Sequence, residues 1–424
     1  MTKIVTNTIR RLLVGKKQNF VFSKFDHGKS ELPKTDKTNL YVHIPFCKSM
    51  CPYCPYNRVR YQKKLIKPYI KSLLKEIELY HRELGDLEIS SIYIGGGTPT
   101  NAINELEEVI AKIKNTFNVT GDIAIETTIS DINKYNVKKL RSYGVNMISV
   151  GVQTFNDNYL KLIGRNYTSQ DIKYAINILK QADFDTINID LMFALPEQTE
   201  NDILHDIKKS IDLDVDQITT YPLFTFPYST VGEYLKVKKI KMPSFLVRRK
   251  FYKLFHDEFL KNGYSISSVW GFIKNNNSKQ KYSSVTRDNY IGLGAGAGSR
   301  HETLFYFNTF SIREYCNRLS KEILPIAVNM PITKNLSRYY WLYWRLYEAT
   351  FSFNDFNKHA DLKMKTLLKI SYFLGLCNVR GNRIVLPENV AFWVHVAQNY
   401  FMLNYINKVW SVMKKEAFPK EITI

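Results

Sequence analysis

The sequence predicts an α/β protein organised around a partial (β/α)6 barrel, with an N-terminal extension and a small helical, winged-helix-like C-terminal domain. Six short apolar runs alternate with amphipathic stretches, and each run ends in a polar, aromatic or glycine-rich group. The 424 residues are 45% hydrophobic, which is enough for one large core and a smaller one. We expect the extension at 1–38, the barrel at 39–300 and the C-terminal domain at 301–424.

The extension is polar and basic apart from an apolar group at Phe20–Phe25, and we expect it to pack across the barrel. Repeated strand and helix units follow it. The predicted strands, in chain order, are 39–44, 89–94, 122–126, 146–151, 185–190 and 216–221. Between them, apolar residues recur at intervals of three and four, as in 68–84 and 103–117, which is typical of helices that cover a parallel sheet.

The second half of the chain predicts a helix over 242–263, an aromatic helix around 339–344 and a short hairpin within 375–386. We expect the aromatic helix to belong to the core, with a flat hydrophobic surface for a substrate as the alternative. The glycines of 292–298 resemble a dinucleotide-binding fingerprint. No strand, turn and helix unit surrounds them, so this interpretation is rejected.

The formal net charge of +21 would suit a nucleic-acid partner, but the basic residues are spread along the whole chain. We therefore expect no nucleic acid, and we interpret the two denser groups, 63–67 and 236–241, as solvated surfaces. No apolar run has the length of a membrane span, and the N-terminus lacks the features of a signal peptide. These observations predict a cytoplasmic protein.

Three cysteines, Cys47, Cys51 and Cys54, follow the first predicted strand with the spacing C-x3-C-x2-C. Thiolates packed so tightly in one loop are typical ligands of an iron-sulfur cluster. Three cysteines leave one iron of a [4Fe-4S] cubane without a protein ligand, and such an open iron can bind and activate a small molecule. A structural zinc site that uses His43 as fourth ligand is the alternative, although zinc motifs usually come as two separated pairs.

The polar groups that follow the other strands should meet at the same mouth, because parallel barrels place their chemistry at the carboxyl ends of the strands. Gly95–Gly97 would let the backbone approach a ligand and offer free N–H groups to a carboxylate. Glu126 follows the third strand, with a structural hydrogen-bond acceptor as the alternative role. Further candidates after the later strands are Gln153, Asp190 and Phe224.

The run Tyr41-Val-His-Ile-Pro-Phe-Cys47, with Cys51 and Cys54, resembles the signature of radical S-adenosylmethionine (SAM) enzymes. Within them the chain resembles the oxygen-independent coproporphyrinogen III oxidase family, which also holds haem chaperones and radical SAM C-methyltransferases. The resemblance covers about 39–300. It implies a radical SAM barrel, a [4Fe-4S] cluster on the three cysteines and a SAM at the open iron, which is cleaved to a 5'-deoxyadenosyl radical.

The resemblance also implies which residues would bind two SAM molecules, while the catalytic residues stay unknown. The first SAM would meet Gly96, Glu126 and Gly298, and Tyr41 and Tyr53 would line the sites. The second would meet Gly97, Thr98, Gln153, Arg165 and Asp190. Phe224 is added as the end of the sixth strand. The implied partners are a tetrapyrrole or haem as the small molecule, and an electron donor such as flavodoxin or ferredoxin.

Three reactions stay open. The oxidases carry a further cysteine where this chain has Tyr56, which disfavours oxidative decarboxylation of a porphyrinogen. The chaperones carry a His-Asn-x-x-Tyr-Trp segment where this chain has 281–286, which disfavours a haem chaperone without turnover. By elimination we expect a C-methyltransferase that acts on a tetrapyrrole or another unsaturated ring, with the second SAM as methyl donor.

Overall fold

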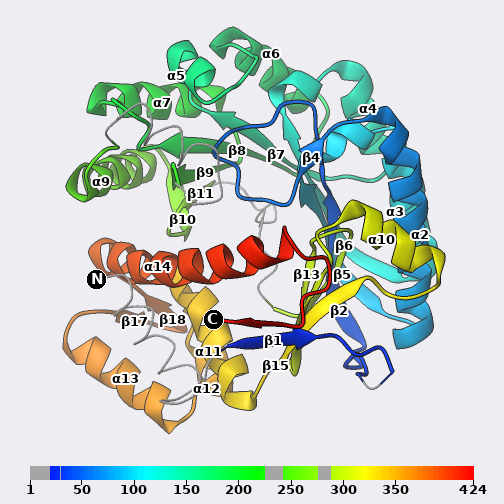
Figure 1. Cartoon of the computed structure of the whole chain (residues 1–424). Coiled ribbons are helices and arrows are strands. Elements are labelled where there is room, and N and C mark those ends of the chain that lie inside the picture. Colours follow the sequence, from blue (N-terminus) through cyan, green and yellow to red (C-terminus); the bar gives the residue numbers. More distant parts are fainter. Residues whose placement is uncertain (1–19, 29, 225–241, 276–287) are drawn as a thin grey trace.

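The computed structural model describes residues 20–28, 30–224, 242–275 and 288–424 (Figure 1). The six predicted strands are present and lie side by side in a parallel arrangement, which confirms the predicted (β/α) pattern. They are β2 (Lys37–Ile44), β5 (Glu88–Gly96), β6 (Asn118–Thr128), β7 (Met147–Gln153), β8 (Thr186–Phe193) and β9 (Gln217–Pro222). Their common direction brings all six carboxyl ends to one edge.

Helices cover the outer side of this parallel sheet and form the arc at the top and right of Figure 1. They are α2 (Lys63–Leu84), α3 (Leu106–Thr116), α4 (Lys134–Ser142), α5 (Asp157–Leu162), α6 (Ser169–Lys180) and α7 (Glu200–Leu213). The apolar residues that recur along α2, such as Ile70, Leu73 and Ile77, are buried, as the spacing predicts. The predicted helix over 242–263 is confirmed as α9 (Phe245–Lys261).

The sheet continues beyond the six parallel strands on both sides. Next to β9 lie β11 (Gly271–Lys274) and β10 (Tyr264–Ser268). Next to β2 lie β12 (Tyr290–Leu293), β13 (Gly298–Arg300), β14 (Leu304–Asn308), β15 (Ile326–Pro331), β1 (Val21–Lys24) and β19 (Glu421–Thr423). The sheet therefore crosses residue 300, because Gly298 pairs with Phe307, and the N-terminal segment joins it as β1.

The C-terminal part combines helices with a small three-stranded sheet. Its helices are α10 (Ile312–Ser320), α11 (Lys334–Glu348), α12 (Phe353–His359), α13 (Leu362–Phe373) and α14 (Glu388–Met413). The small sheet holds β16 (Thr350–Ser352), β18 (Arg383–Val385) and β17 (Asn378–Arg380), and the β17–β18 hairpin confirms the one predicted within 375–386. Helix α14 runs across the middle of Figure 1. Within the described ranges, no helix combines the length and apolar character needed to cross a bilayer.

Candidate active site

A cavity of about 710 Å³ lies at the carboxyl ends of the parallel strands. This volume falls within the range of roughly 300–1,000 Å³ that is usual for sites of small molecules and cofactors. Most of the site residues expected from the sequence line it: Cys47, Cys51, Tyr53, Cys54, Gly96, Gly97, Thr98, Glu126, Gln153, Arg165, Asp190 and Phe224. The structure therefore brings together residues that lie far apart in the chain, on one edge of one sheet.

Two of the expected site residues are not on the cavity lining. Tyr41 lies on β2 in a small buried cluster with Tyr93, and its hydroxyl is 2.8 Å from Nδ1 of His43. Gly298 lies in β13 against the ring of Phe307, so close that an added Cβ would be 2.9 Å from Cε1 of that ring. Strand order explains the position of Gly298, because β12 separates β13 from β2, the nearest of the six parallel strands.

The cysteine loop is held at its base by a short strand pair, β3 (Phe46–Cys47) with β4 (Val59–Arg60). The N–H of Val59 donates to Pro45 O, and the N–H of Tyr61 donates to Cys47 O, each at 2.8 Å. Inside the loop the guanidinium of Arg58 donates to the carbonyl of Cys51. These bonds close the loop on itself and present its thiols to the cavity.

His43 is not available as a metal ligand, which removes the zinc alternative. Its Nε2 lies 2.7 Å from the carbonyl of Asn57 and its Nδ1 faces the hydroxyl of Tyr41, so both ring nitrogens are engaged. Burial lowers the pKa of His43 to about 4. Among the described residues, no three His, Cys, Asp or Glu side chains are grouped so that they could hold one metal ion.

The three thiols fit an iron-sulfur cluster instead. A cubane of four irons and four sulfides spans a wider space than a single ion, and soft thiolates are its usual ligands. Cys47 and Cys51 are buried and Cys54 is half-buried, all three beside the cavity. Burial raises the pKa of Cys47 to about 11, although Thr98 donates to its sulfur at 3.8 Å. Iron would therefore bind with loss of a thiol proton.

The glycine turn after β5 lies directly against the cysteine loop. Gly96 has φ +119°, and an added Cβ would come within 2.9 Å of the His43 ring. A Cβ on Gly97 would be 2.9 Å from the sulfur of Cys47. Only glycine allows this approach, because any side chain would push the loop away.

The expectation that this turn offers free N–H groups is wrong for the residues closest to the cysteines. The N–H of Gly97 donates to Ile44 O at 2.8 Å, and that of Thr98 donates to Phe46 O at 3.1 Å. The N–H of Gly96 does meet a carboxylate, but it is that of Glu126, at 3.2 Å. The physical reason is that the turn continues the pairing with the segment after β2.

Two carboxylates face the cavity from β6 and β8, the strands on either side of β7. Glu126 accepts hydrogen bonds from Gly96 N and from the hydroxyl of Tyr93, and burial raises its pKa. Asp190 accepts from Nδ2 of Asn188 at 2.9 Å, and burial together with the charge of Glu126 raises its pKa to about 7. A cationic or hydroxyl-bearing ligand placed beside them would stabilise their charged forms.

A guanidinium lies on the same wall. Arg165 stands over two aromatic rings, with its Cζ 6.0 Å from the centre of Tyr53 and 5.8 Å from that of Tyr167. Its buried Nε has no hydrogen-bond partner among the described residues. Gln153, beside it, has φ 73° and accepts a hydrogen bond of 2.7 Å from the hydroxyl of Tyr221. The wall thus carries donors for an anionic group and acceptors for a cationic one.

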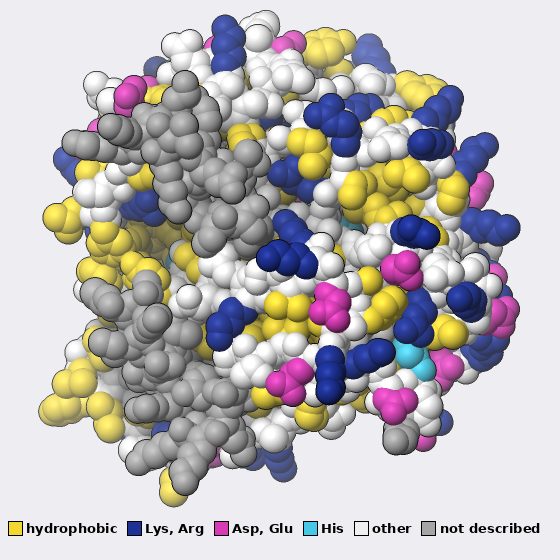
Figure 2. Space-filling view, in the orientation of Figure 1, with side chains coloured by type: hydrophobic (Ala, Val, Ile, Leu, Met, Phe, Trp, Pro, Cys, Tyr) yellow, Lys and Arg dark blue, Asp and Glu magenta, His cyan; other side chains and the backbone are white. Residues whose placement is uncertain are grey.

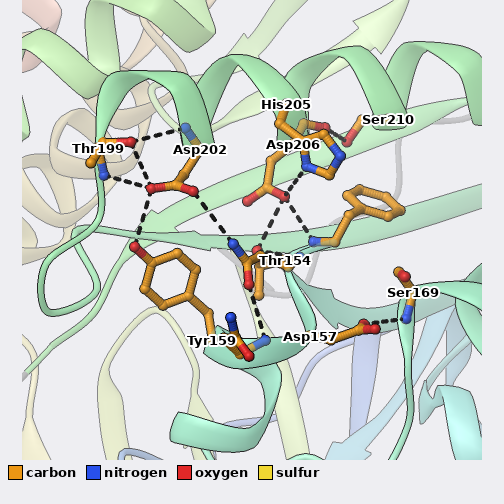
Figure 3. Close-up of polar contacts among 12 residues, drawn as sticks. Thr154, Asp157, Tyr159, Ser169, Thr199, Asp202, His205, Asp206 and Ser210 are labelled. Atoms are coloured by element: carbon orange, nitrogen blue, oxygen red, sulfur yellow. Dashed lines mark hydrogen bonds and ion pairs between the residues drawn. The ribbon is translucent and has the colours of Figure 1, made fainter.

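The turn that carries Gln153 is anchored from behind by α7 (Figure 3). Asp206, which is buried, accepts from the hydroxyl of Thr154 at 3.1 Å and from the N–H of Phe155 at 2.7 Å. One turn earlier in the helix, Asp202 accepts from the hydroxyl of Tyr159 at 3.1 Å. The left-handed backbone conformation of Gln153 costs free energy, because Gln153 is not a glycine. The hydrogen bonds to Asp206 and Asp202 help to hold this conformation.

One wall of the cavity is formed in part by the aromatic helix, for which the sequence favours a core role and offers a flat hydrophobic surface as the alternative. It is aromatic and combines Trp270, from the turn between β10 and β11, with Tyr343, Trp344 and Tyr347 of α11. The sequence favoured a core role for this helix, whereas part of it lines the cavity. The signal was the density of aromatic residues along one helix. Other lining residues without a prior expectation include Lys48, Tyr56, Arg58, Asp131, Tyr167, His395, Asn399 and Met402.

Comparison with known proteins agrees with this architecture. The family model described as Radical SAM superfamily matches residues 41–209. The chain is 31% identical over 294 residues to the heme chaperone HemW of Lactococcus lactis. The alignment covers 67% of this chain and 76% of that protein. It is 25% identical over 326 residues to the oxygen-independent coproporphyrinogen III oxidase of Synechocystis sp., with coverages of 71% and 68%.

A solved structure, the coproporphyrinogen III oxidase HemN of Escherichia coli, superimposes with a TM-score of 0.76 at 20% identity and covers 91% of this chain and 97% of its own. This likeness shows a common fold. The radical SAM match implies a [4Fe-4S] cluster and SAM, and the thiols, the glycine turn and the polar strand ends fit both. The chain belongs to the radical SAM superfamily, in the family of HemW and the oxygen-independent coproporphyrinogen III oxidases.

Proposed function

We propose that this chain is a radical SAM enzyme that binds a tetrapyrrole in the cavity described above, with SAM between that ring and the cysteine loop. One observation carries the proposal: the cysteine loop and the aromatic wall of Trp270, Tyr343, Trp344 and Tyr347 line the same cavity. Flat aromatic side chains suit a flat ring system. The names of the relatives, a heme chaperone and a coproporphyrinogen oxidase, supply the substrate class.

Cys47, Cys51 and Cys54 would hold the [4Fe-4S] cluster, which supplies the electron for cleavage of SAM bound at its open iron. The remaining residues bind and orient. Glu126 would accept from the ammonium group of the first SAM, a role that its position at the glycine turn supports. A second SAM would lie nearer Arg165 and Asp190, with the guanidinium donating to a carboxylate.

A haem chaperone is the second candidate, and two observations favour it. The relative of 31% identity is a heme chaperone, and position 56 carries a half-exposed tyrosine at the cavity and not a thiol. The segment 281–286, which departs from the chaperone pattern, lies outside the described residues. Methyl transfer, expected from the sequence by elimination, has no support among the relatives above. It is therefore an outcome of the experiment and not part of the proposal.

The experiment compares products under anaerobic conditions. The chain is reconstituted with iron and sulfide and given a reductant and SAM, alone or with coproporphyrinogen III or haem. We expect 5'-deoxyadenosine, formed faster when a tetrapyrrole is present, and a tetrapyrrole that co-elutes with the protein. Carbon dioxide would identify decarboxylation, and S-adenosylhomocysteine would identify methyl transfer. Haem retention without cleavage of SAM would favour the chaperone. Cleavage of SAM at the same rate with and without coproporphyrinogen III or haem, by a chain that retains neither, would contradict the proposed substrate class.

A further inference from the structure

Helix α13 exposes an apolar face that no described part of the chain covers. The exposed side chains are Leu362, Leu367, Ile370, Phe373, Leu374 and Leu376, which we call the α13 face. Phe373 is 89% exposed and Leu362 is 82% exposed. The opposite side of the helix packs inward through Met364, which is buried. In Figure 2, hydrophobic side chains lie at the lower left edge, where Figure 1 places α13.

Exposed apolar residues in such a group are unusual on a folded protein and mark a surface that meets an apolar partner. Leu362, Ile370 and Phe373 lie on one side of the helix, because separations of eight and three residues place them within about a quarter turn of one another. Leu374 and Leu376 follow directly after the end of the helix. The α13 face is therefore a group of apolar side chains on one side of α13 and at its C-terminal end.

Basic residues lie among and beside these apolar side chains, and acidic residues are absent from the group. Lys363, Lys365 and Lys369 of α13 are exposed, and Arg380 and Arg383 of the adjacent hairpin are exposed as well. The whole stretch 362–386 holds these five cations and no aspartate or glutamate. Exposed apolar side chains next to cations suit the surface of an anionic lipid layer, which offers both acyl chains and phosphate groups.

We propose that the α13 face docks onto an anionic lipid surface. Phe373, Leu374 and Ile370 would insert among the upper parts of the acyl chains, while the lysines and arginines would meet the phosphate groups. Charge complementarity favours lipid over a second copy of this chain, because a symmetric dimer would bring the same cations of both copies together. Docking of this kind is peripheral and reversible. It is independent of the reaction at the cavity.

Vesicle flotation of the full reconstituted chain tests the proposal. The vesicles contain either equal parts of phosphatidylglycerol and phosphatidylcholine or phosphatidylcholine alone. We expect the chain to float with the anionic vesicles and to bind the neutral ones about tenfold more weakly. Raising the ionic strength well above 0.1 M, at which the screening length is about 10 Å, should release it in part. Failure to bind the anionic vesicles would overturn the proposal.

Two variants separate the two contributions to binding. Ile370→Ser with Phe373→Ser removes apolar surface, and Lys363→Glu with Lys365→Glu and Lys369→Glu reverses charge. Each should weaken binding to anionic vesicles about tenfold or more. Because these side chains are exposed, iron content and SAM cleavage should match those of the native chain. A loss of iron or of SAM cleavage would show that the variant is misfolded, and the other of the two variants would then decide.

A matched control lies on α4, which is more than 200 residues before α13 in the chain. Tyr135 is exposed there between Lys134 and Lys138, so Tyr135→Ser with both lysines changed to glutamate removes similar groups from another surface. This variant should keep native vesicle binding. If it loses binding equally, the effect is one of net charge and the α13 face is not the docking site. A native dimer in sedimentation equilibrium that Phe373→Ser dissociates would show that a second copy covers the face, and would also overturn the proposal.

Discussion

Trp270 donates its indole N–H to Nε2 of His395 and so joins the barrel to helix α14 beside the cavity. The bond fixes the imidazole as an acceptor at Nε2, and burial lowers the pKa of His395 to about 3, so the ring is neutral. The two ring planes are nearly perpendicular, with centroids 4.9 Å apart. The aromatic wall of the cavity is therefore held to the C-terminal helix by a specific polar contact.

Trp270→Phe should lower the free energy of unfolding by about 1–3 kcal/mol, because it leaves Nε2 of His395 buried without its donor. His395→Phe removes the acceptor from the other side. The double variant should cost less than the sum of the two single variants, since they share one bond. Denaturant unfolding of all four chains measures this coupling. If the losses of unfolding free energy in the two single variants simply add in the double variant, Trp270 and His395 do not share this bond.

Trp344→Ala should weaken the binding of a tetrapyrrole about tenfold, because it removes a large flat surface from the cavity wall. Binding of SAM in the absence of a tetrapyrrole should stay unchanged. The control is Trp393→Ala, which truncates an exposed tryptophan that does not line the cavity. Haem or porphyrin titration followed by absorbance checks both. Equal losses in the two variants would show that the effect does not come from the cavity wall.

Glu126→Gln should lower the affinity for SAM about tenfold or more, because the carboxylate is replaced by a neutral amide beside the expected ammonium group. The amide oxygen can still accept from Tyr93 or Gly96, so the fold should be retained. Glu108→Gln, an exposed change on α3, serves as the control. Equilibrium dialysis of labelled SAM gives the affinities. Unchanged affinity in Glu126→Gln would leave this residue with a structural role only.

Asp206 should make the stability of the chain depend on pH. Burial raises the pKa of its carboxyl from 3.8 to about 7, despite the hydrogen bonds from Thr154 and Phe155 and with a further increase from the charge of Asp202. Between these values the folded chain keeps a proton that the unfolded chain releases. The stabilisation of the folded chain by this retained proton is therefore fully present below pH 4 and is lost as pH rises towards 7.

Asp206→Asn removes this titration while its amide oxygen can still accept from Thr154 and Phe155. The variant should therefore gain stability relative to the native chain as pH rises from 4 to 7, by up to about 4 kcal/mol. Denaturant unfolding across this pH range measures the difference. Asp212→Asn, an exposed change on the same helix, should leave the native profile unaltered. A constant difference between Asp206→Asn and the native chain at all pH values would contradict the assignment.

The sequence predicted the parallel strands because each is an apolar run with a distinct polar ending, and one edge of one sheet must then collect those endings. Cys47, Glu126 and Asp190 could be placed at a common mouth by this argument alone. The position of Gly298 could not, since it depends on an antiparallel pairing with Phe307 that no local pattern specifies. The pairing of the N-terminal segment with β15 and β19 is equally non-local.

The aromatic wall shows the other limit. A helix such as α11 has aromatic residues on several sides, and periodicity does not say which of them face a core and which face a cavity. Trp341 packs against Phe351, whereas Trp344 lines the cavity, although they are one turn apart. That distinction is set by how the C-terminal part sits on the barrel, which is a tertiary property.

If Cys47, Cys51 and Cys54 hold the cluster at which SAM is cleaved, the loss of one of these thiols must abolish cleavage. The most direct test is Cys51→Ala, reconstituted without oxygen beside the native chain and assayed for bound iron and for 5'-deoxyadenosine. Cys316→Ala is the matched control, because this half-exposed cysteine is not on the cavity lining. We predict that Cys51→Ala forms no 5'-deoxyadenosine, while Cys316→Ala matches the native chain. Undiminished 5'-deoxyadenosine from Cys51→Ala would show that the three thiols do not hold a cluster that SAM cleavage requires.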